Sequence, residues 1–247
     1  MSYTKDEIKL MKQRIGKNAI SLLPEEGVVN IGYGIASSYL TPEIKDNYPK
    51  LLIQVESCVL GMTDFNGDVP HRVDPAGVMV NVSERASKSD TITDAFSLMN
   101  RGKIDQTYLG ALQVDSYGNL ANWAASENEK YGIGGAAELC ANAKEVIILM
   151  IEDDKFGNSK LLEKCTMPLT YPACVSLIVT EKGFYKPTGA QTELEWSSFD
   201  NEKSEEVEKI LYSGSEMDGW FRQVAKWSDE SESYEPYFKW VKGFSPE

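Results

Sequence analysis

The chain has 247 residues, enough for one large α/β domain or two small ones, and its 42% hydrophobic residues can bury a sizeable core. The formal net charge of −13 argues against a nucleic-acid partner, and no apolar run approaches the roughly 20 residues that a membrane span needs. The N-terminal residues lack the apolar core of a secretory signal and are too acidic for an organellar transit peptide, so we expect a cytoplasmic protein.

The first predicted element is a helix with a capping box, in which Thr4 caps the helix and Glu7 reaches back to Thr4. Apolar residues then recur at helical spacing as far as Leu22, and Pro24 with Gly27 ends the helix. A short strand, Val28 to Ile31, follows and runs into Gly32-Tyr33-Gly34 before a helical stretch. Two glycines in this position suit a turn where the backbone approaches a ligand closely, although such a pair more often forms only a turn.

The second strand brings a carboxylate to its end. Leu51-Leu52-Ile53 is an apolar run typical of a buried strand, and Glu56 falls where that strand should stop. In open α/β sheets the ligand crevice lies outside the carboxyl ends of the strands, so Glu56 is a candidate catalytic residue. The alternative from position alone is an ordinary solvated glutamate.

The middle of the chain alternates strands, helices and turns. We expect a loop over Thr63 to Gly77, a strand over Val78 to Val82, a helix over Thr91 to Met99 that Ser89-Asp90 caps and Gly102 stops, a strand over Thr107 to Leu112, and a type I turn at Asp115 to Gly118.

Gly132-Ile133-Gly134-Gly135 opens a predicted helix from Ala136 to Ala143. Amide N–H groups at a helix start favour anions and developing oxyanions, but glycine also serves tight packing of a helix on a strand, and the motif alone favours neither. Val146 to Ile151 is apolar throughout, which is typical of a central parallel strand, and Val175 to Thr180 is a further strand. The alternation predicts an α/β fold, an open and mostly parallel sheet with helices on both faces.

We predict one domain over residues 1–185 and a C-terminal extension over residues 186–247. The extension is acidic and holds four of the five tryptophans, Trp196, Trp220, Trp227 and Trp240. Disordered tails are poor in aromatic residues, so we expect a folded extension packed on the body or on a partner subunit.

The cysteines are scattered at Cys58, Cys140, Cys165 and Cys174, and His71 is the single histidine. Structural zinc sites need closely spaced Cys and His pairs, so we expect no metal site and reduced, mostly buried thiols.

An ordered set of motifs lies between roughly residues 28 and 185: Asn30–Ile35, Gln54–Ser57 with Leu60–Met62, Asp94–Phe96, Leu109–Asp115, Tyr117–Trp123, Gly132–Ala136, Cys165–Thr170 and Ile178–Gly183. With this set the chain resembles the second, catalytic-type subunit of class I coenzyme A transferases of the 3-oxoacid and glutaconate type.

The resemblance implies a coenzyme A transferase fold and roles for individual residues. Glu56 falls on the catalytic glutamate that forms a glutamyl-CoA thioester, Gly135 on a glycine whose amide helps to form the oxyanion hole, and Asn30 on an asparagine lining the acyl site. Together with Gly32, Gly34 and Gly134, these residues are the expected site. The resemblance implies no bound cofactor, with coenzyme A as co-substrate.

The chain departs from the family pattern at three places: Ser57-Cys58 after the glutamate, Ala36 in place of a common proline, and Val78 where the 3-oxoacid branch tends to have lysine. The half of the enzyme with the glycine-rich CoA-binding loop is absent, and so acidic a chain is a poor lone site for the phosphates of CoA. We therefore expect a homologous alpha-type partner subunit, in an α2β2 heterotetramer, with an acyl-CoA and a small carboxylic acid as substrates.

Two other functions stay open from the sequence. One is a lyase, decarboxylase or hydrolase of the same fold that acts on an acyl-CoA. The other is a non-catalytic assembly subunit, against which the glutamate at position 56 argues.

Overall fold

The computed structural model describes residues 3–55, 59–60, 62–64, 72–73, 79–82, 92–126, 130, 132–187, 217–218, 221–228 and 233–236. Within these residues ten strands form one sheet, whose path runs β14-β15-β13-β12-β10-β7-β1-β2-β3, with β16 paired to β15. The centre of this sheet is parallel: β2 (Lys50–Val55), β1 (Glu26–Ile31), β7 (Gln106–Leu109), β10 (Glu145–Leu149) and β12 (Leu177–Val179).

Antiparallel strands extend the sheet at both edges. On one side β3 (Val59–Leu60) pairs with β2. On the other side β13 (Gly183–Pro187) pairs with β12, and then follow β15 (Phe221–Ser228), β14 (Met217–Asp218) and β16 (Ser233–Pro236). Strands from the predicted C-terminal extension therefore continue the main sheet through β13. The proposed domain boundary at residue 185 stays a prediction.

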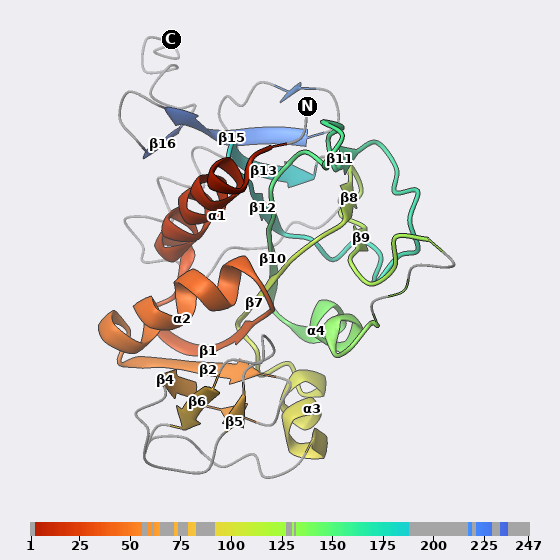
Figure 1. Cartoon of the computed structure of the whole chain (residues 1–247). Helices are drawn as coiled ribbons and strands as arrows, with labels where there is room; N and C mark the ends of the chain where they lie inside the picture. Colours follow the sequence, from red (N-terminus) through yellow and green to blue (C-terminus); the bar gives the residue numbers. More distant parts are fainter. Residues whose placement is uncertain are drawn as a thin grey trace, which may run out of the picture.

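Helices cover both faces of the parallel centre (Figure 1). One face carries α1 (Lys5–Ala19), the short helix η1 (Ile20–Leu22) and α2 (Ile35–Asn47), and the other carries α3 (Ile92–Asn100) and α4 (Ala136–Asn142). Strand alternation divides the core in the same way. In β10, Ile147 and Leu149 pack against the first group of helices, whereas Val146 and Ile148 pack against the second.

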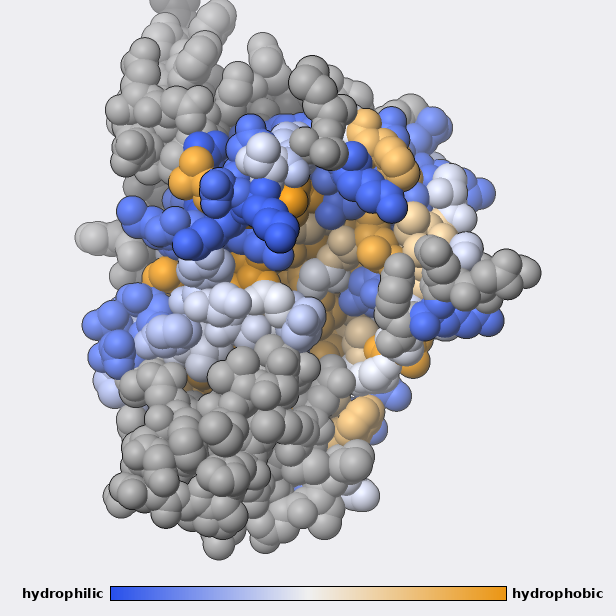
Figure 2. All heavy atoms as spheres, in the orientation of Figure 1, coloured by the Kyte–Doolittle hydropathy of each residue, from blue (hydrophilic) through white to orange (hydrophobic). Residues whose placement is uncertain are grey.

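The first helix shows how local sequence positions an element. Thr4 and Glu7 form the predicted capping box, with the Glu7 amide donating to Thr4 Oγ1 at 3.3 Å and the Thr4 amide donating to Glu7 Oε2 at 2.7 Å. Its buried side, Ile15, Gly16 and Ala19, packs inward, while its outward side is hydrophilic (Figure 2). Gly16 leaves room for Tyr39 of α2, because a Cβ at position 16 would overlap the Tyr39 side chain.

Two smaller sheets lie beside the main one. β8 (Gln113–Asp115) pairs with β9 (Leu120–Ala121) and with β11 (Leu161–Leu162), and β6 (Met79–Val82) pairs with β4 (Met62–Asp64) and β5 (Arg72–Val73). The prediction of a loop over residues 63–77 is therefore wrong in part, since pieces of β4 and β5 fall within it and pair with β6. The strand expected over residues 107–112 ends at Leu109.

The α/β fold with a central parallel sheet and helices on both faces is confirmed. The strands that extend this sheet at its edges are antiparallel. Within the residues that the structure describes, no helix has both the length and the apolarity to cross a membrane.

Candidate active site at the switch point of the sheet

The order of the strands reverses between β1 and β7. The chain passes from β1 through α2 to β2 on one side, and later returns to place β7 on the other side of β1. The helix after β1 covers one face and the helix after β7 covers the opposite face. In open α/β sheets ligands bind outside the carboxyl ends of the strands at such a switch point, and three of the expected site residues, Asn30, Gly32 and Gly34, lie at the end of β1 or directly after it.

Gly32 lies against the neighbouring strand. Its amide donates to the Tyr108 carbonyl at 2.9 Å, and a Cβ on Gly32 would lie 2.6 Å from that carbonyl oxygen. The glycine is therefore needed for the close approach of β1 and β7 at the switch point, whatever binds there.

Gly34 has a different reason to be glycine. Its φ of +100° is a conformation that side chains disfavour, although a Cβ there would meet nothing within 4 Å. Its amide donates to Ser37 Oγ at 3.2 Å, and Ser37 Oγ donates back to the Gly34 carbonyl at 3.1 Å. The turn presents Tyr33, which is 69% exposed, to the outside.

Asn30 is 1% exposed and belongs to a row of polar side chains across three parallel strands. Its Nδ2 donates to Gln54 Oε1 at 2.7 Å and to the Gln54 carbonyl at 3.3 Å, and its Oδ1 accepts from Thr107 Oγ1 at 2.9 Å. Gln54 and Thr107 are its direct neighbours in register on β2 and β7.

The second predicted glycine turn leads into α4. Gly132 and Gly134 are exposed and have positive φ angles of +92° and +52°, whereas Gly135 is buried and caps the helix. The Leu139 amide donates to the Gly135 carbonyl at 3.0 Å, and the Leu139 side chain is buried on the face of the sheet that α3 and α4 cover. The turn before α4 thus belongs to the face of the sheet on which Asn30 lies.

Glu56, the expected nucleophile, lies outside the described residues, as do Ser57 and Cys58. The structure does describe the two strands on either side of these residues. β2 ends at Val55, and β3 begins at Val59 and pairs with it in antiparallel fashion, so three residues join the two strands. β2 is the neighbour of β1 in the sheet, which brings its carboxyl end beside that of β1.

Two polar residues of this region were not among the expected site residues. Gln54 and Thr107 are fully buried partners of Asn30 and lie on the side of the sheet that α3 and α4 cover. A search for polar residues at matching places in neighbouring strands would have found them, but only with the strand order already known.

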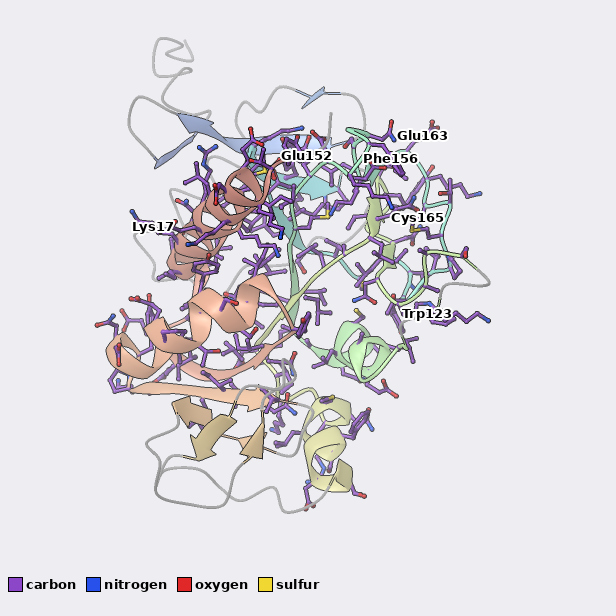
Figure 3. The ribbon with its side chains drawn as sticks, viewed as in Figure 1. Lys17, Trp123, Glu152, Phe156, Glu163 and Cys165 are labelled. Carbon is purple, nitrogen blue, oxygen red and sulfur yellow. The ribbon has the colours of Figure 1, made fainter. Side chains whose placement is uncertain are left out.

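The described cysteines, Cys140, Cys165 and Cys174, are free thiols. Burial, together with the charge of Asp115 and its hydrogen bond, raises the pKa of Cys165 to about 12, so its thiol stays protonated at neutral pH. Cys165 lies on the side of the molecule that carries Phe156 and Glu163 (Figure 3). In the described part of the chain, no three His, Cys, Asp or Glu side chains group closely enough to hold a metal ion.

Comparison with known proteins gives a consistent family. Residues 14–219 match the family model for coenzyme A transferase. The chain is 40% identical over 174 residues to the probable coenzyme A transferase subunit beta of Bacillus subtilis (strain 168), which covers 69% of this chain and 79% of that one. It is 34% identical over 190 residues to the mitochondrial succinyl-CoA:3-ketoacid coenzyme A transferase 2A of Rattus norvegicus, with 71% of this chain but only 34% of the rat protein covered.

Among solved structures, the acyl-CoA transferase YdiF of Escherichia coli O157:H7 superposes with a TM-score of 0.56 over 71% of this chain and 36% of that one, at 16% identity, and thereby shows the same fold. The family match spans most of the chain and agrees with the fold and with the switch point where the expected site residues lie. The chain belongs to the coenzyme A transferase family.

Proposed function

We propose that this chain is the catalytic subunit of a cytoplasmic enzyme that transfers coenzyme A between an acyl-CoA and a carboxylic acid. The observation that carries the proposal is the 40% identity over 174 residues to a coenzyme A transferase beta subunit. The fold supports it, because Asn30, Gly32 and Gly34 lie at the switch point where ligands bind in open α/β sheets.

In the proposed reaction the Glu56 carboxylate attacks the thioester carbonyl of the acyl-CoA. The tetrahedral oxyanion expels the CoA thiolate and leaves a mixed anhydride of the acyl group and Glu56. The thiolate then attacks the Glu56 carbonyl of this anhydride, which releases the first carboxylic acid and leaves a glutamyl-CoA thioester. An acceptor carboxylate reverses these steps and leaves as the new acyl-CoA, with Glu56 regenerated.

A carboxylate is a weak nucleophile, so the reaction depends on fixed donors toward the oxyanion. We assign this task to the glycine turn that opens α4, with the Gly135 amide as the expected donor and Gly134 as a neighbouring substrate-binding residue. In the turn after β1, Gly32 and Gly34 carry no Cβ that could narrow the approach of the acyl group, and Asn30 precedes this turn in β1.

We propose that a homologous alpha-type subunit completes the enzyme, in an α2β2 heterotetramer. The relative from Bacillus subtilis is named a subunit beta, and the chain matches only 34% of the much longer rat enzyme. The net charge of −13 supports the same arrangement, because the phosphates of CoA need a basic site, which the partner would supply. Coenzyme A is then a co-substrate, and no resident cofactor takes part.

The test uses the complex of this chain with its partner subunit. Incubation with an acyl-CoA in the absence of an acceptor acid, followed by borohydride, should reduce the glutamyl thioester to an alcohol. We expect loss of activity and a mass change confined to the peptide that contains Glu56. Glu56→Ala should lose transferase activity and show no trapped species, whereas Glu163→Ala, which removes an exposed glutamate side chain, should behave as wild type.

The other outcomes identify the alternatives. Turnover of an acyl-CoA with Glu56 unmodified would support a lyase, decarboxylase or hydrolase of the same fold. Activity of Glu56→Ala within a few-fold of wild type would instead support a non-catalytic role for this chain.

A further inference from the structure

The row of polar side chains on β1, β2 and β7 is a single directed chain of hydrogen bonds. Thr107 Oγ1 donates to Asn30 Oδ1 at 2.9 Å, Asn30 Nδ2 donates to Gln54 Oε1 at 2.7 Å, and Gln54 Nε2 donates to the Val55 carbonyl at 3.2 Å. We call these three residues, Thr107, Asn30 and Gln54, the polar ladder. None of them is more than 1% exposed.

The surroundings of the polar ladder are apolar. The same face of the sheet carries Leu109 and Ile148, and Met99 of α3 with Leu139 of α4 belongs to the core that covers it. Buried amides and hydroxyls cost free energy unless they are hydrogen-bonded, and a paired set contributes little more to stability than apolar residues of the same shape. What a satisfied polar network adds is a fixed geometry for its members.

The polar ladder ends on the carbonyl oxygen of Val55, the residue directly before Glu56. The Val55 carbonyl belongs to the last residue of β2, and the peptide bond that it begins leads directly to Glu56. A peptide unit is planar from one Cα to the next. A hydrogen bond to the Val55 carbonyl therefore restrains the orientation of the whole peptide plane between Val55 and Glu56. The donor to that carbonyl, Gln54, is itself held by Asn30, and Asn30 by Thr107.

We infer that Thr107, Asn30 and Gln54 are positioning residues for the transfer reaction, which hold the carboxyl end of β2 so that the next side chain meets the thioester in a fixed orientation. The inference rests on the proposed function, in which Glu56 is the nucleophile. It gives Asn30 a task besides lining the acyl site, and it assigns tasks to Gln54 and Thr107, which the resemblance did not. Thr107 tests it best, because its fully buried hydroxyl donates to Asn30, and Asn30 is its one side-chain partner among the residues that the structure describes.

The experiment compares two substitutions in neighbouring residues of β7, measured in the complex with the partner subunit. Thr107→Val keeps the shape and removes the donor to Asn30. Tyr108→Phe is the matched control. It also removes a hydroxyl from a 0% exposed side chain, here one that donates to Gln106 Oε1 at 2.8 Å, but on the opposite face of the sheet.

A misplaced nucleophile lowers the chemical step more than substrate binding. For Thr107→Val we expect kcat to fall by about tenfold or more, with KM for the acyl-CoA within about twofold of wild type. The rate at which borohydride traps the glutamyl-CoA species should fall by the same factor. Thr107→Ser, which restores the hydroxyl, should recover most of kcat, and Tyr108→Phe should keep kcat even where its melting temperature falls as far as that of Thr107→Val.

Equal kcat in Thr107→Val and wild type would overturn the inference, as would equal losses of kcat in Thr107→Val and Tyr108→Phe. If Thr107→Val does not fold, Gln54→Met, which removes the donor to the Val55 carbonyl, is measured in its place under the same criteria. These failures differ from failure of the proposed function. In the latter case no species is trapped at Glu56 even in the wild-type complex, whereas an error about the polar ladder leaves wild-type trapping intact.

Discussion

Asp115 offers the sharpest test of the forces that hold the segment around Cys165 against β8. From the sequence it is only the first residue of a turn, a place that asparagine fills equally well. In the structure its carboxylate is buried and accepts four hydrogen bonds. Oδ1 accepts from the amides of Tyr117 and Asn119, each at 3.1 Å, and Oδ2 accepts from Asn119 Nδ2 at 2.9 Å and from the Cys165 amide at 3.0 Å.

The substitution Asp115→Asn keeps the volume and removes half of the acceptors. Whichever way the new amide is turned, two of the four donors face its NH2 group instead of an oxygen. A buried donor left without an acceptor costs about 1–3 kcal/mol, so two should cost about 2–6 kcal/mol in the free energy of unfolding. At about 2–4 °C per kcal/mol for a chain of this length, that corresponds to a fall of roughly 4–24 °C in Tm.

The chain contains a matched control. Asp154-Lys155-Phe156-Gly157-Asn158 repeats the pattern of Asp115-Ser116-Tyr117-Gly118-Asn119. Asp154 makes the corresponding bonds, to the amides of Phe156 and Asn158 at 2.8 and 2.9 Å and to Asn158 Nδ2 at 3.2 Å, but it does so in contact with water. Because water replaces whatever the exposed turn loses, Asp154→Asn should leave Tm within about 1 °C of wild type.

Thermal and urea unfolding of the two variants against wild type measure the difference. Equal, small effects in both turns would show that Asp115 acts only as a turn residue, and that the bond to Cys165 contributes nothing to holding residues 163–166 against β8.

Three further outcomes follow from the same structure. Gly16→Ala should destabilise the fold by about 1–3 kcal/mol, although alanine has the higher helix propensity, because the new methyl group overlaps Tyr39. Chemical unfolding of Gly16→Ala, Tyr39→Ala and the double variant should show strong coupling between the two changes in unfolding free energy. Additive changes would refute the clash. Cys165, whose pKa is about 12, should react with iodoacetamide at pH 8 at least ~100-fold more slowly than a free cysteine, and rapid labelling of the native protein followed by peptide mass spectrometry would contradict this. Burial also raises the pKa of the Glu181 carboxyl group. The stability that the protonated carboxyl contributes is therefore complete below the ordinary pKa of 4.5 and is lost as the pH rises through the raised pKa. Glu181→Gln should therefore melt above wild type at pH 8 but not at pH 4, and the same offset at both pH values would refute the assignment.

Those parts of the fold that depend on local sequence were predictable. The capping box at Thr4 and Glu7 is present, and the apolar run from Val146 lies in a fully buried parallel strand at the centre of the sheet. The glycine turn before α4 leads into the predicted helix. In each case a few neighbouring residues, through caps or periodicity, determine the element without help from the rest of the chain.

The parts that failed depend on contacts between distant segments. β4 and β5 are strands because they pair with β6, and the residues between 63 and 77 are otherwise rich in turn formers. The strand expected to reach Leu112 stops at Leu109, and a separate sheet begins at Gln113, where β8 pairs with β9 and β11. Two- and three-residue strands carry too little periodicity to be found before their partners are known.

The expected site likewise has features that local sequence predicts and features that depend on distant contacts. Chain order alone placed Asn30, Gly32 and Gly34 at a strand end, and the parallel sheet brings them to the switch point. The reason for glycine at position 32 was not visible in the sequence, since it is the carbonyl of Tyr108, more than 70 residues away along the chain. The partners of Asn30 were missed for the same reason.

Burial of polar groups alone does not distinguish a functional network from a structural one, because the sheet contains one of each kind. On the face toward α1 and α2, Gln106 accepts from the Tyr108 hydroxyl and donates to Glu145 Oε2 and to the Leu22 carbonyl. That network lies at the amino ends of β7 and β10 and ties η1 to the sheet. The polar ladder lies on the other face, near the carboxyl ends of β1 and β2. In open parallel sheets ligands bind outside the carboxyl ends of the strands. We therefore assign a structural role to the buried hydrogen bonds at the amino ends and a role in the reaction to those of the polar ladder. The comparison of Thr107→Val with Tyr108→Phe measures that difference between two adjacent residues of a single strand.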